Sequence, residues 1–274
     1  MPVWVQSSLG RKRRLAATVF MHPDKTNDLA KYPARRAVHQ LQEATGPIAQ
    51  FFFAGVLGML GVVALVSGIS GGVLPVPLAA GLVVFVSAML IATAGLVKTY
   101  PHRAIGWCNA VTVFRLTLAS VLAAWLFTPP ASPWIVFWIA ILAFALDGVD
   151  GWFARREGRV SDFGARFDME VDALLAIVIA VHAFLHGEVG ALVLLLGLPR
   201  YAFLLAQFAF PWLGDDLPPR YSRKVVCVVQ IGVLIVLLAP GLGALVANGL
   251  VIAALAVVGW SFWVDVTWLK RARA

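Results

Sequence analysis

Residues 147–172 read DGVDGWFARREGRVSDFGARFDMEVD, and the fold and function of this chain can be worked out from four of the five aspartates within them, Asp147, Asp150, Asp168 and Asp172. These aspartates lie in two apolar runs, 133–154 and 164–186, which a short basic loop joins. Spacings of three and four residues return to the same side of a helix, so each pair of aspartates shares one helix face. A helical hairpin would therefore bring the two acidic faces together.

The close approach of four carboxylates predicts a metal site. Such groups repel one another unless they are protonated or bound to hard cations, which prefer oxygen ligands. We therefore expect a divalent cation, Mg²⁺ or Mn²⁺. The small residues Gly151, Ala154 and Gly164 leave room on the same faces for a bulky ligand. A nucleotide diphosphate suits that gap, because metal ions commonly bridge its phosphates.

The composition on either side of this stretch is that of a membrane protein. Of 274 residues, 61% are hydrophobic and 13% are charged. A helix needs about 20 apolar residues to cross a hydrocarbon core of roughly 30 Å. The chain contains eight such runs, so we predict an all-α polytopic membrane protein with about eight spans, at residues 48–69, 76–97, 107–127, 133–154, 164–186, 189–212, 224–243 and 246–268.

The basic residues sort to alternate connections between these runs. Lys98, Arg103 and the stretches 155–166, 220–224 and 270–273 carry Lys and Arg, whereas 128–133, 186–188 and 240–248 carry none. The positive-inside rule then predicts that both termini and the aspartates are cytoplasmic. We attribute the net charge of +8 to this topology and to attraction for anionic membrane lipids, and we expect no nucleic-acid partner.

The aspartate stretch resembles a known family signature. The pattern D-x2-D-G-x2-A-R-x8-G-x3-D-x3-D is that of the CDP-alcohol phosphotransferase (CDP-alcohol phosphatidyltransferase) family, and the chain matches every fixed position. The resemblance covers roughly residues 105–268 and implies a six-helix catalytic core, residues 105–270. Before it come a basic cytoplasmic segment, 1–46, and a two-helix hairpin, 47–98, which the signature does not explain. We expect this hairpin to pack on the core or to support a homodimer.

The resemblance also implies roles for individual residues. Asp147, Asp150 and Asp168 correspond to metal ligands, and Asp172 to the aspartate proposed to deprotonate the acceptor hydroxyl and also to touch metal. Upstream, residues 109–115 resemble the family's N-x2-T-x2-R motif, although Cys108 replaces the usual proline. The positions expected around the CDP group are Asn109, Thr112, Asp147, Gly151, Ala154, Arg155 and Gly164.

Four basic residues are candidates for binding the acceptor. Arg200 follows Pro199 inside an apolar run, and a charge at such depth normally faces a polar cavity or a partner. Arg223 and Lys224 open the next run and resemble a basic position in family members with a phosphorylated acceptor. Together with Arg220 they would hold an acceptor phosphate. Asp265, near the end of the last run, is expected to pair with Lys270 or Arg271.

The resemblance implies an enzyme of phospholipid biosynthesis in a bacterial inner membrane. It would transfer a phosphatidyl group from CDP-diacylglycerol to a polar alcohol and release CMP, with glycerol 3-phosphate as the favoured acceptor. Inositol phosphate, serine or choline fits the same motif, as does a CDP-choline or CDP-ethanolamine donor. An ion- or proton-coupled transporter also fits intramembrane acids and a lone arginine. A non-catalytic relative is a further alternative.

Overall fold

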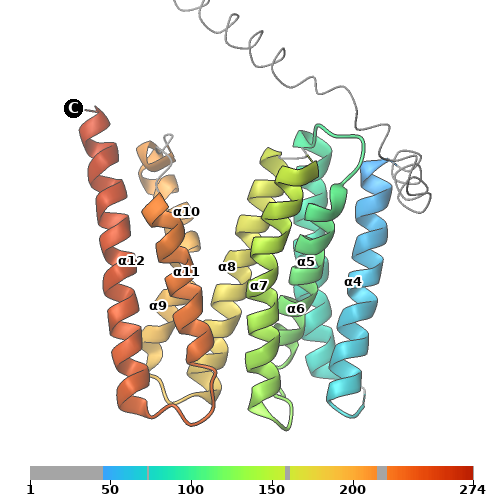
Figure 1. The fold of residues 1–274 in the computed structure, drawn as a ribbon, viewed down its shortest axis with the longest axis horizontal. Coiled ribbons are helices and arrows are strands. Elements are labelled where there is room, and N and C mark those ends of the chain that lie inside the picture. Colours follow the sequence, from blue (N-terminus) through green and yellow to red (C-terminus); the bar gives the residue numbers. More distant parts are fainter. Residues whose placement is uncertain (1–45, 73, 158–160, 215–220, 274) are drawn as a thin grey trace, which may run out of the picture. The chain divides into compact units, whose positions relative to one another are not determined.

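The computed structural model describes residues 46–72, 74–157, 161–214 and 221–273, and all regular secondary structure in these residues is helical. This confirms the predicted all-α fold (Figure 1). The predicted basic segment 1–46 lies outside the described residues apart from Gly46. The elements are α4 (Pro47–Ile69), α5 (Pro75–Thr99), α6 (Gly106–Ala124), α7 (Pro133–Glu157), α8 (Asp162–His186), η1 (Ala191–Val193), α9 (Leu194–Gly197), α10 (Pro199–Ala209), η2 (Pro211–Gly214), α11 (Tyr221–Val236) and α12 (Ala244–Arg273).

The helices have the length and surface of membrane spans. Five of them, α4, α5, α6, α8 and α12, are long and apolar enough to cross a bilayer. Large apolar side chains such as Phe52, Ile91 and Leu245 are 71%, 74% and 90% exposed, which suits a hydrocarbon solvent and not water. The chain is therefore a polytopic integral membrane protein, as predicted.

The expected span at 189–212 is broken. In place of one straight helix, the residues from Ala191 to Gly197 and from Pro199 to Ala209 form two segments bent by 68°. Pro199 explains the break, since it has no backbone N–H to donate and its ring clashes with the carbonyl group four residues earlier. Helix α7 covers the whole expected span 133–154. Helix α11, with 16 residues, ends at Val236, before the end of the expected span 224–243.

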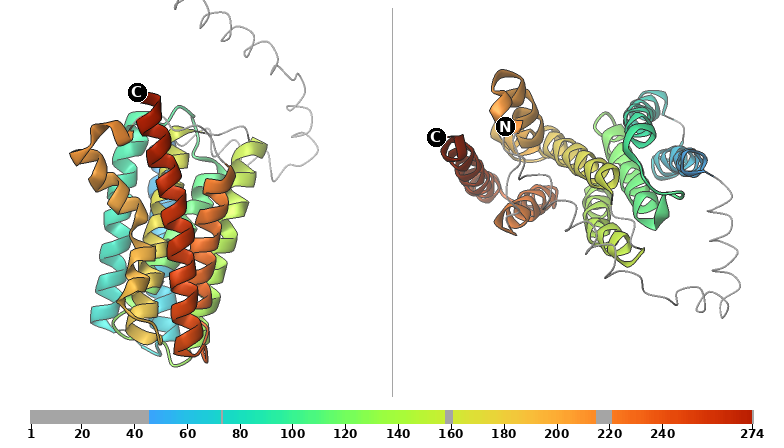
Figure 2. Two further views of the ribbon diagram at one scale, coloured as in Figure 1. Left: turned by 90° about the vertical axis from the view of Figure 1, so that its left-hand side faces the viewer. Right: turned by 90° about the horizontal axis from the view of Figure 1, so that it is seen from above.

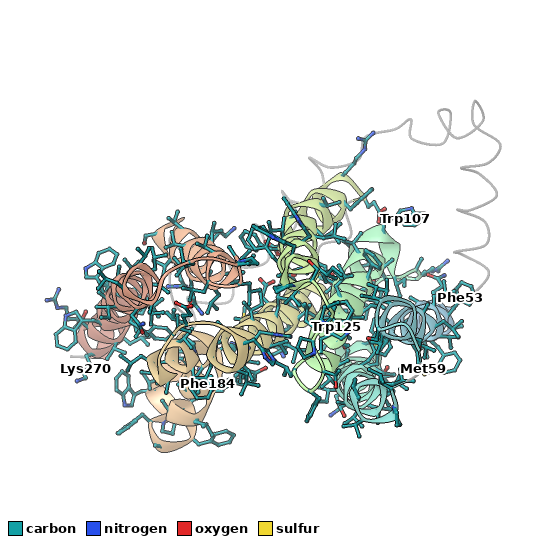
Figure 3. The ribbon with its side chains drawn as sticks, turned by 90° about the horizontal axis from the view of Figure 1, so that it is seen from below. Phe53, Met59, Trp107, Trp125, Phe184 and Lys270 are labelled. Atoms are coloured by element: carbon teal, nitrogen blue, oxygen red, sulfur yellow. The ribbon has the colours of Figure 1, made fainter. Side chains whose placement is uncertain are left out.

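The α4–α5 hairpin packs against α6, and α5 also touches α8. Glycines allow this close approach: a Cβ at Gly81 would lie 3.0 Å from the Ser120 carbonyl oxygen of α6, and one at Gly58 would clash with Phe85. As a result α6 is buried along most of its length. Trp125, just after it, is fully buried and lies among the helices, whereas Phe53 and Lys270 lie at opposite edges (Figure 3).

On the other side of α8 stand α9, α11 and α12 (Figure 2). A Cβ at Gly197 of α9 would lie 2.8 Å from the Ile177 Cα, so α8 and α9 are in backbone contact. Helix α11 packs on α7, α8 and α12. The end of α7 and the starts of α6, α8 and α11 meet at one end of these helices, which we call the aspartate end.

Candidate active site

Three of the four signature aspartates converge at the aspartate end. Asp147 belongs to the last part of α7, and Asp168 and Asp172 to the first three turns of α8. One carboxylate oxygen from each lies within 4.8 Å of those from the other two. The side chains are 35%, 34% and 31% exposed respectively, so the cluster is open on one side. A ligand can reach these oxygens.

Part of the signature lies beyond the described side chains. Asp150, Ala154 and Arg155 belong to α7, but nothing is described of their side chains. Their predicted roles, and that of Gly151 one residue after Asp150, stay predictions. Asp150 follows Asp147 by three residues and so shares its helix face.

Arg115 of α6 occupies the centre of the cluster. Its side chain is fully buried, and its guanidinium group forms ion pairs with Asp168 and Asp172 and lies 3.3 Å from Asp147 Oδ1. The Arg115 Nε–H donates to the Ala143 carbonyl oxygen of α7, at 3.1 Å. One residue thus holds α6, α7 and α8 together beneath the three carboxylates.

Sequence reasoning assigned no role to Arg115. It appeared only as the last residue of the N-x2-T-x2-R motif. The available signal was its position within an apolar run, because intramembrane charges are costly and nearly always have a partner or a function. The same signal led to a prediction for Arg200 and was not applied to Arg115.

The charge balance of the cluster fits a divalent cation. Three carboxylates and one guanidinium group leave a net charge of about −2. Clustered carboxylate oxygens are the donors that Mg²⁺ and Mn²⁺ prefer. The described residues therefore fit a hard metal ion, with Asp147, Asp168 and Asp172 as its ligands.

Two residues predicted around the nucleotide, Asn109 and Gly164, lie next to each other. Asn109 is buried on α6, and its side-chain amide donates to the Ile105 carbonyl oxygen at 2.6 Å. A Cβ at Gly164 would lie 3.3 Å from Asn109 Oδ1 and 3.2 Å from Ser161 Oγ. The close contact between the start of α8 and Asn109 therefore explains why a glycine occupies position 164.

Thr112, the other predicted residue on α6, is buried one turn after Asn109 and donates to the Cys108 carbonyl oxygen at 3.0 Å. Asn109, Thr112 and Arg115 are spaced by three residues and so follow one stripe of α6. Arg115, the last residue of this stripe, contacts the aspartate cluster.

The start of α11 faces the same cluster. Arg223 donates from Nε and Nη2 to Asp265 of α12, at 3.1 and 3.3 Å, so Asp265 pairs with Arg223 in place of the expected Lys270 or Arg271. Cys227, one turn after Arg223, is exposed and within electrostatic range of Asp172, Asp147 and Arg223. Lys224, the residue after Arg223, is exposed. Arg220 lies outside the described residues.

Arg200 takes a different position. Its Nη2 lies 2.6 Å from Glu170 Oε1 of α8. Glu170 is two residues from both Asp168 and Asp172, or about 200° around the helix, and so lies on the opposite face of α8. The structure does not bring Arg200 to the aspartates, and its predicted part in acceptor binding stays a prediction.

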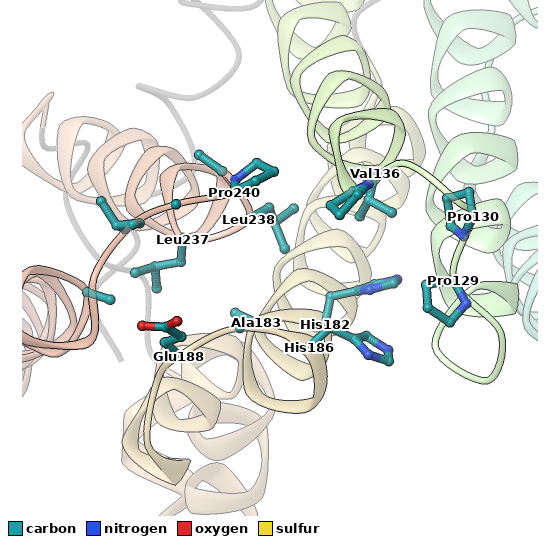
Figure 4. A pocket seen from close by; sticks show the side chains of 16 residues that line it. Pro129, Pro130, Val136, His182, Ala183, His186, Glu188, Leu237, Leu238 and Pro240 are labelled. Atoms are coloured by element: carbon teal, nitrogen blue, oxygen red, sulfur yellow. The ribbon is translucent and has the colours of Figure 1, made fainter.

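A small cavity of about 280 Å³ lies at the other end of the helices (Figure 4). His182 and His186 of α8 lie on the side of Pro129 and Pro130, and Glu188 on the side of Leu237. The imidazole Nε2 of His182 lies 2.7 Å from the Leu122 carbonyl oxygen, which accounts for the buried ring. This cavity shares no residue with the aspartate cluster.

Comparison with known proteins assigns the core of the chain. The family model for CDP-alcohol phosphatidyltransferase matches residues 106–264, which run from the start of α6 into α12. The match includes all four signature aspartates and Arg115. It begins after the α4–α5 hairpin. No curated protein and no solved structure matches the chain significantly.

Proposed function

Because the chain belongs to the CDP-alcohol phosphatidyltransferase family, we propose that it transfers a phosphatidyl group from CDP-diacylglycerol to a polar alcohol and releases CMP. The observation that carries this proposal is the cluster of Asp147, Asp168 and Asp172, half-open at the ends of two apolar helices. A diacylglycerol group needs a hydrocarbon solvent, while its CDP group needs a polar, cation-binding pocket. The aspartate end of these helices supplies both.

In the proposed reaction, Asp172 accepts the proton of the acceptor hydroxyl. The acceptor oxygen forms a bond to the β-phosphorus of CDP-diacylglycerol, and the bond from that phosphorus to the bridging oxygen breaks, so the electron pair leaves with CMP. The ion pair with Arg115 holds the Asp172 carboxylate in one orientation.

Asp147, Asp150 and Asp168 would hold Mg²⁺ or Mn²⁺, with Asp172 also within reach. When bound, such an ion supplies stabilisation of negative charge on the phosphate oxygens. The chain's own contribution is to position the nucleotide, and we propose that Asn109, Thr112, Asp147, Gly151, Ala154, Arg155 and Gly164 surround it. Gly164 and Asn109 would set the space available beside the start of α8.

For the acceptor we propose glycerol 3-phosphate, held by Arg223 and Lys224 and by Arg220. The forked contact of Arg223 with Asp265 fixes its guanidinium group at the start of α11, one turn before Cys227. A fixed guanidinium group suits a phosphate better than a mobile ammonium group does. Lys224 is exposed beside it and adds a second positive charge.

We also propose that the aspartate end faces the cytoplasm of a bacterial inner membrane. Connections between helices at this end contain Lys and Arg residues, and the connections at the other end contain none. Such an orientation gives the site access to soluble acceptors made in the cytoplasm.

The test is product analysis with purified protein in detergent, Mg²⁺ and CDP-diacylglycerol, across a panel of glycerol 3-phosphate, inositol phosphate, serine and choline. We expect a phosphatidyl product with glycerol 3-phosphate and with none of the other three alcohols. A product with serine or choline alone would overturn the assigned acceptor, and no lipid product with any alcohol would overturn the proposed reaction.

A further inference from the structure

An apolar groove of about 660 Å³ runs between the α4–α5 hairpin and the core. Its walls come from α5 and α8, with Tyr201 of α10 at one side. Val83 and Ile91 are on its rim and are 64% and 74% exposed, whereas Phe163, Phe167 and Val171 form its buried floor. The groove therefore opens to the surface that the hydrocarbon of the bilayer covers.

This groove is separate from the aspartate cluster. Of α8 it uses Phe163, Arg166, Phe167, Glu170, Val171 and Leu174. Glu170, near the middle of this set, is about 200° around the helix from Asp168 and from Asp172, whereas Val171 borders the face of the aspartates. A molecule in the groove and a nucleotide at the aspartates would be on opposite faces of α8. The groove also depends on the hairpin, which precedes the residues that the family model matches.

The end of the groove nearest the aspartate end is positively charged. Lys98 in the last turn of α5 and Arg166 in the second turn of α8 both line it, beside Thr99. Among the described residues neither cation has an ion-pair partner. The carboxylate in the lining, Glu170, is paired with Arg200 and so does not offset them. Two uncompensated cations thus lie where the apolar walls end.

We propose that the groove binds an anionic phospholipid, with its phosphate at Lys98 and Arg166 and an acyl chain along α5 and α8. Apolar walls at the depth of the spans match an acyl chain, and the cations at the polar end match a phosphate whose charge no cationic headgroup offsets. A soluble ligand would leave the apolar part of the groove without a partner. The lipid would join the hairpin to the core beside the active site, without entering it.

The experiment uses a phospholipid with a diazirine in its acyl chain, in detergent with the full-length protein. Phosphatidylglycerol is compared with phosphatidylcholine, and labelled peptides are identified by mass spectrometry. We expect at least threefold more labelling of α5 and the start of α8 by phosphatidylglycerol. The Asp172→Asn variant should be labelled equally, which separates this site from the proposed reaction.

Matched variants decide between specific and general contact with lipid. Ala88→Trp fills the groove and should reduce the label at least threefold, whereas Ala94→Trp, on an exposed position of α5 outside the groove, should not. Lys98→Gln combined with Arg166→Gln should remove the preference for phosphatidylglycerol, and Lys270→Gln combined with Arg271→Gln should keep it.

Three results would overturn the proposal. The first is equal labelling by both phospholipids in the unaltered protein. The second is labelling that Ala88→Trp leaves unchanged. The third is cross-linking between α5 residues of two copies of the chain in lipid, because the groove would then be a contact between subunits.

Discussion

Arg115 of α6 and Asp172 of α8 form an ion pair inside the membrane-spanning part of the chain, with the arginine side chain fully buried. The same guanidinium group contacts Asp168 and approaches Asp147. A positive charge is therefore built into the protein at the point where the signature carboxylates meet. It lowers the repulsion between them.

Arg115→Gln should destabilise the protein and make it more dependent on metal. Removing one partner of a buried ion pair costs about 3–5 kcal/mol, and we expect about 1–3 kcal/mol because the carboxylates are a third exposed. Mg²⁺ should then raise the thermal unfolding temperature more in the variant than in the unaltered protein. Unfolding in detergent with Mg²⁺ or EDTA measures this; equal shifts in both proteins would show that Arg115 does not offset the carboxylates.

Gly164→Ala should weaken binding of the CDP donor. The added Cβ would lie 3.3 Å from Asn109 Oδ1 and 3.2 Å from Ser161 Oγ, so it must displace the start of α8 or the Asn109 side chain. We expect KM for CDP-diacylglycerol to rise about tenfold. Gly232→Ala, in α11 with nothing within 4 Å of its Cβ, is the matched control and should be slightly stabilising by roughly 1 kcal/mol. Similar kinetics for both variants would contradict the role of Gly164.

Arg223→Lys should affect the acceptor and not the donor. Lysine keeps the charge but cannot make the forked contact with Asp265, so its position at the start of α11 is no longer fixed. We expect KM for glycerol 3-phosphate to rise about tenfold, with KM for CDP-diacylglycerol within a factor of about two. Steady-state kinetics on both substrates measure this, with Arg271→Lys as the control. A larger effect on the donor would place Arg223 at the nucleotide.

Cys227 should report occupancy of the site. It is exposed near Asp172 and Asp147, whereas Cys108 is buried, so a maleimide should react with Cys227. Mg²⁺ together with CDP-diacylglycerol should slow this reaction severalfold, because the bound donor covers the thiol. Mass spectrometry of the labelled protein, with Cys227→Ser as background, gives the rate. No protection at saturating donor would show that the donor binds away from α11.

Much of the fold and part of the site could be predicted from local patterns. The spacing of Asp168 and Asp172, together with Asp147 at the end of the preceding run, was enough to infer a hairpin with facing carboxylates. The predictions that were wrong concerned contacts between residues far apart in the sequence. Asp265 pairs with Arg223, 42 residues away, and not with the basic residues next to it in sequence.

Two further differences have the same origin. Arg200 contacts Glu170 because the chain bends at Leu198, and the size of that bend depends on how α9 packs against α8. Pro199 predicts where the helix breaks, but not the direction in which α10 runs after the break. Likewise Arg115 reads as one arginine in an apolar run until α7 and α8 are placed beside it.

The most direct test of the central claim is metal-dependent CMP release from CDP-diacylglycerol by Asp172→Asn, compared with Glu188→Gln at the opposite end of the helices. The unaltered protein and Glu188→Gln should release CMP only when both acceptor and Mg²⁺ are present. Asp172→Asn should be slower by at least about 100-fold, as expected for loss of a general base. Release at the same rate from Asp172→Asn, or no release from any of the three proteins, would contradict the account.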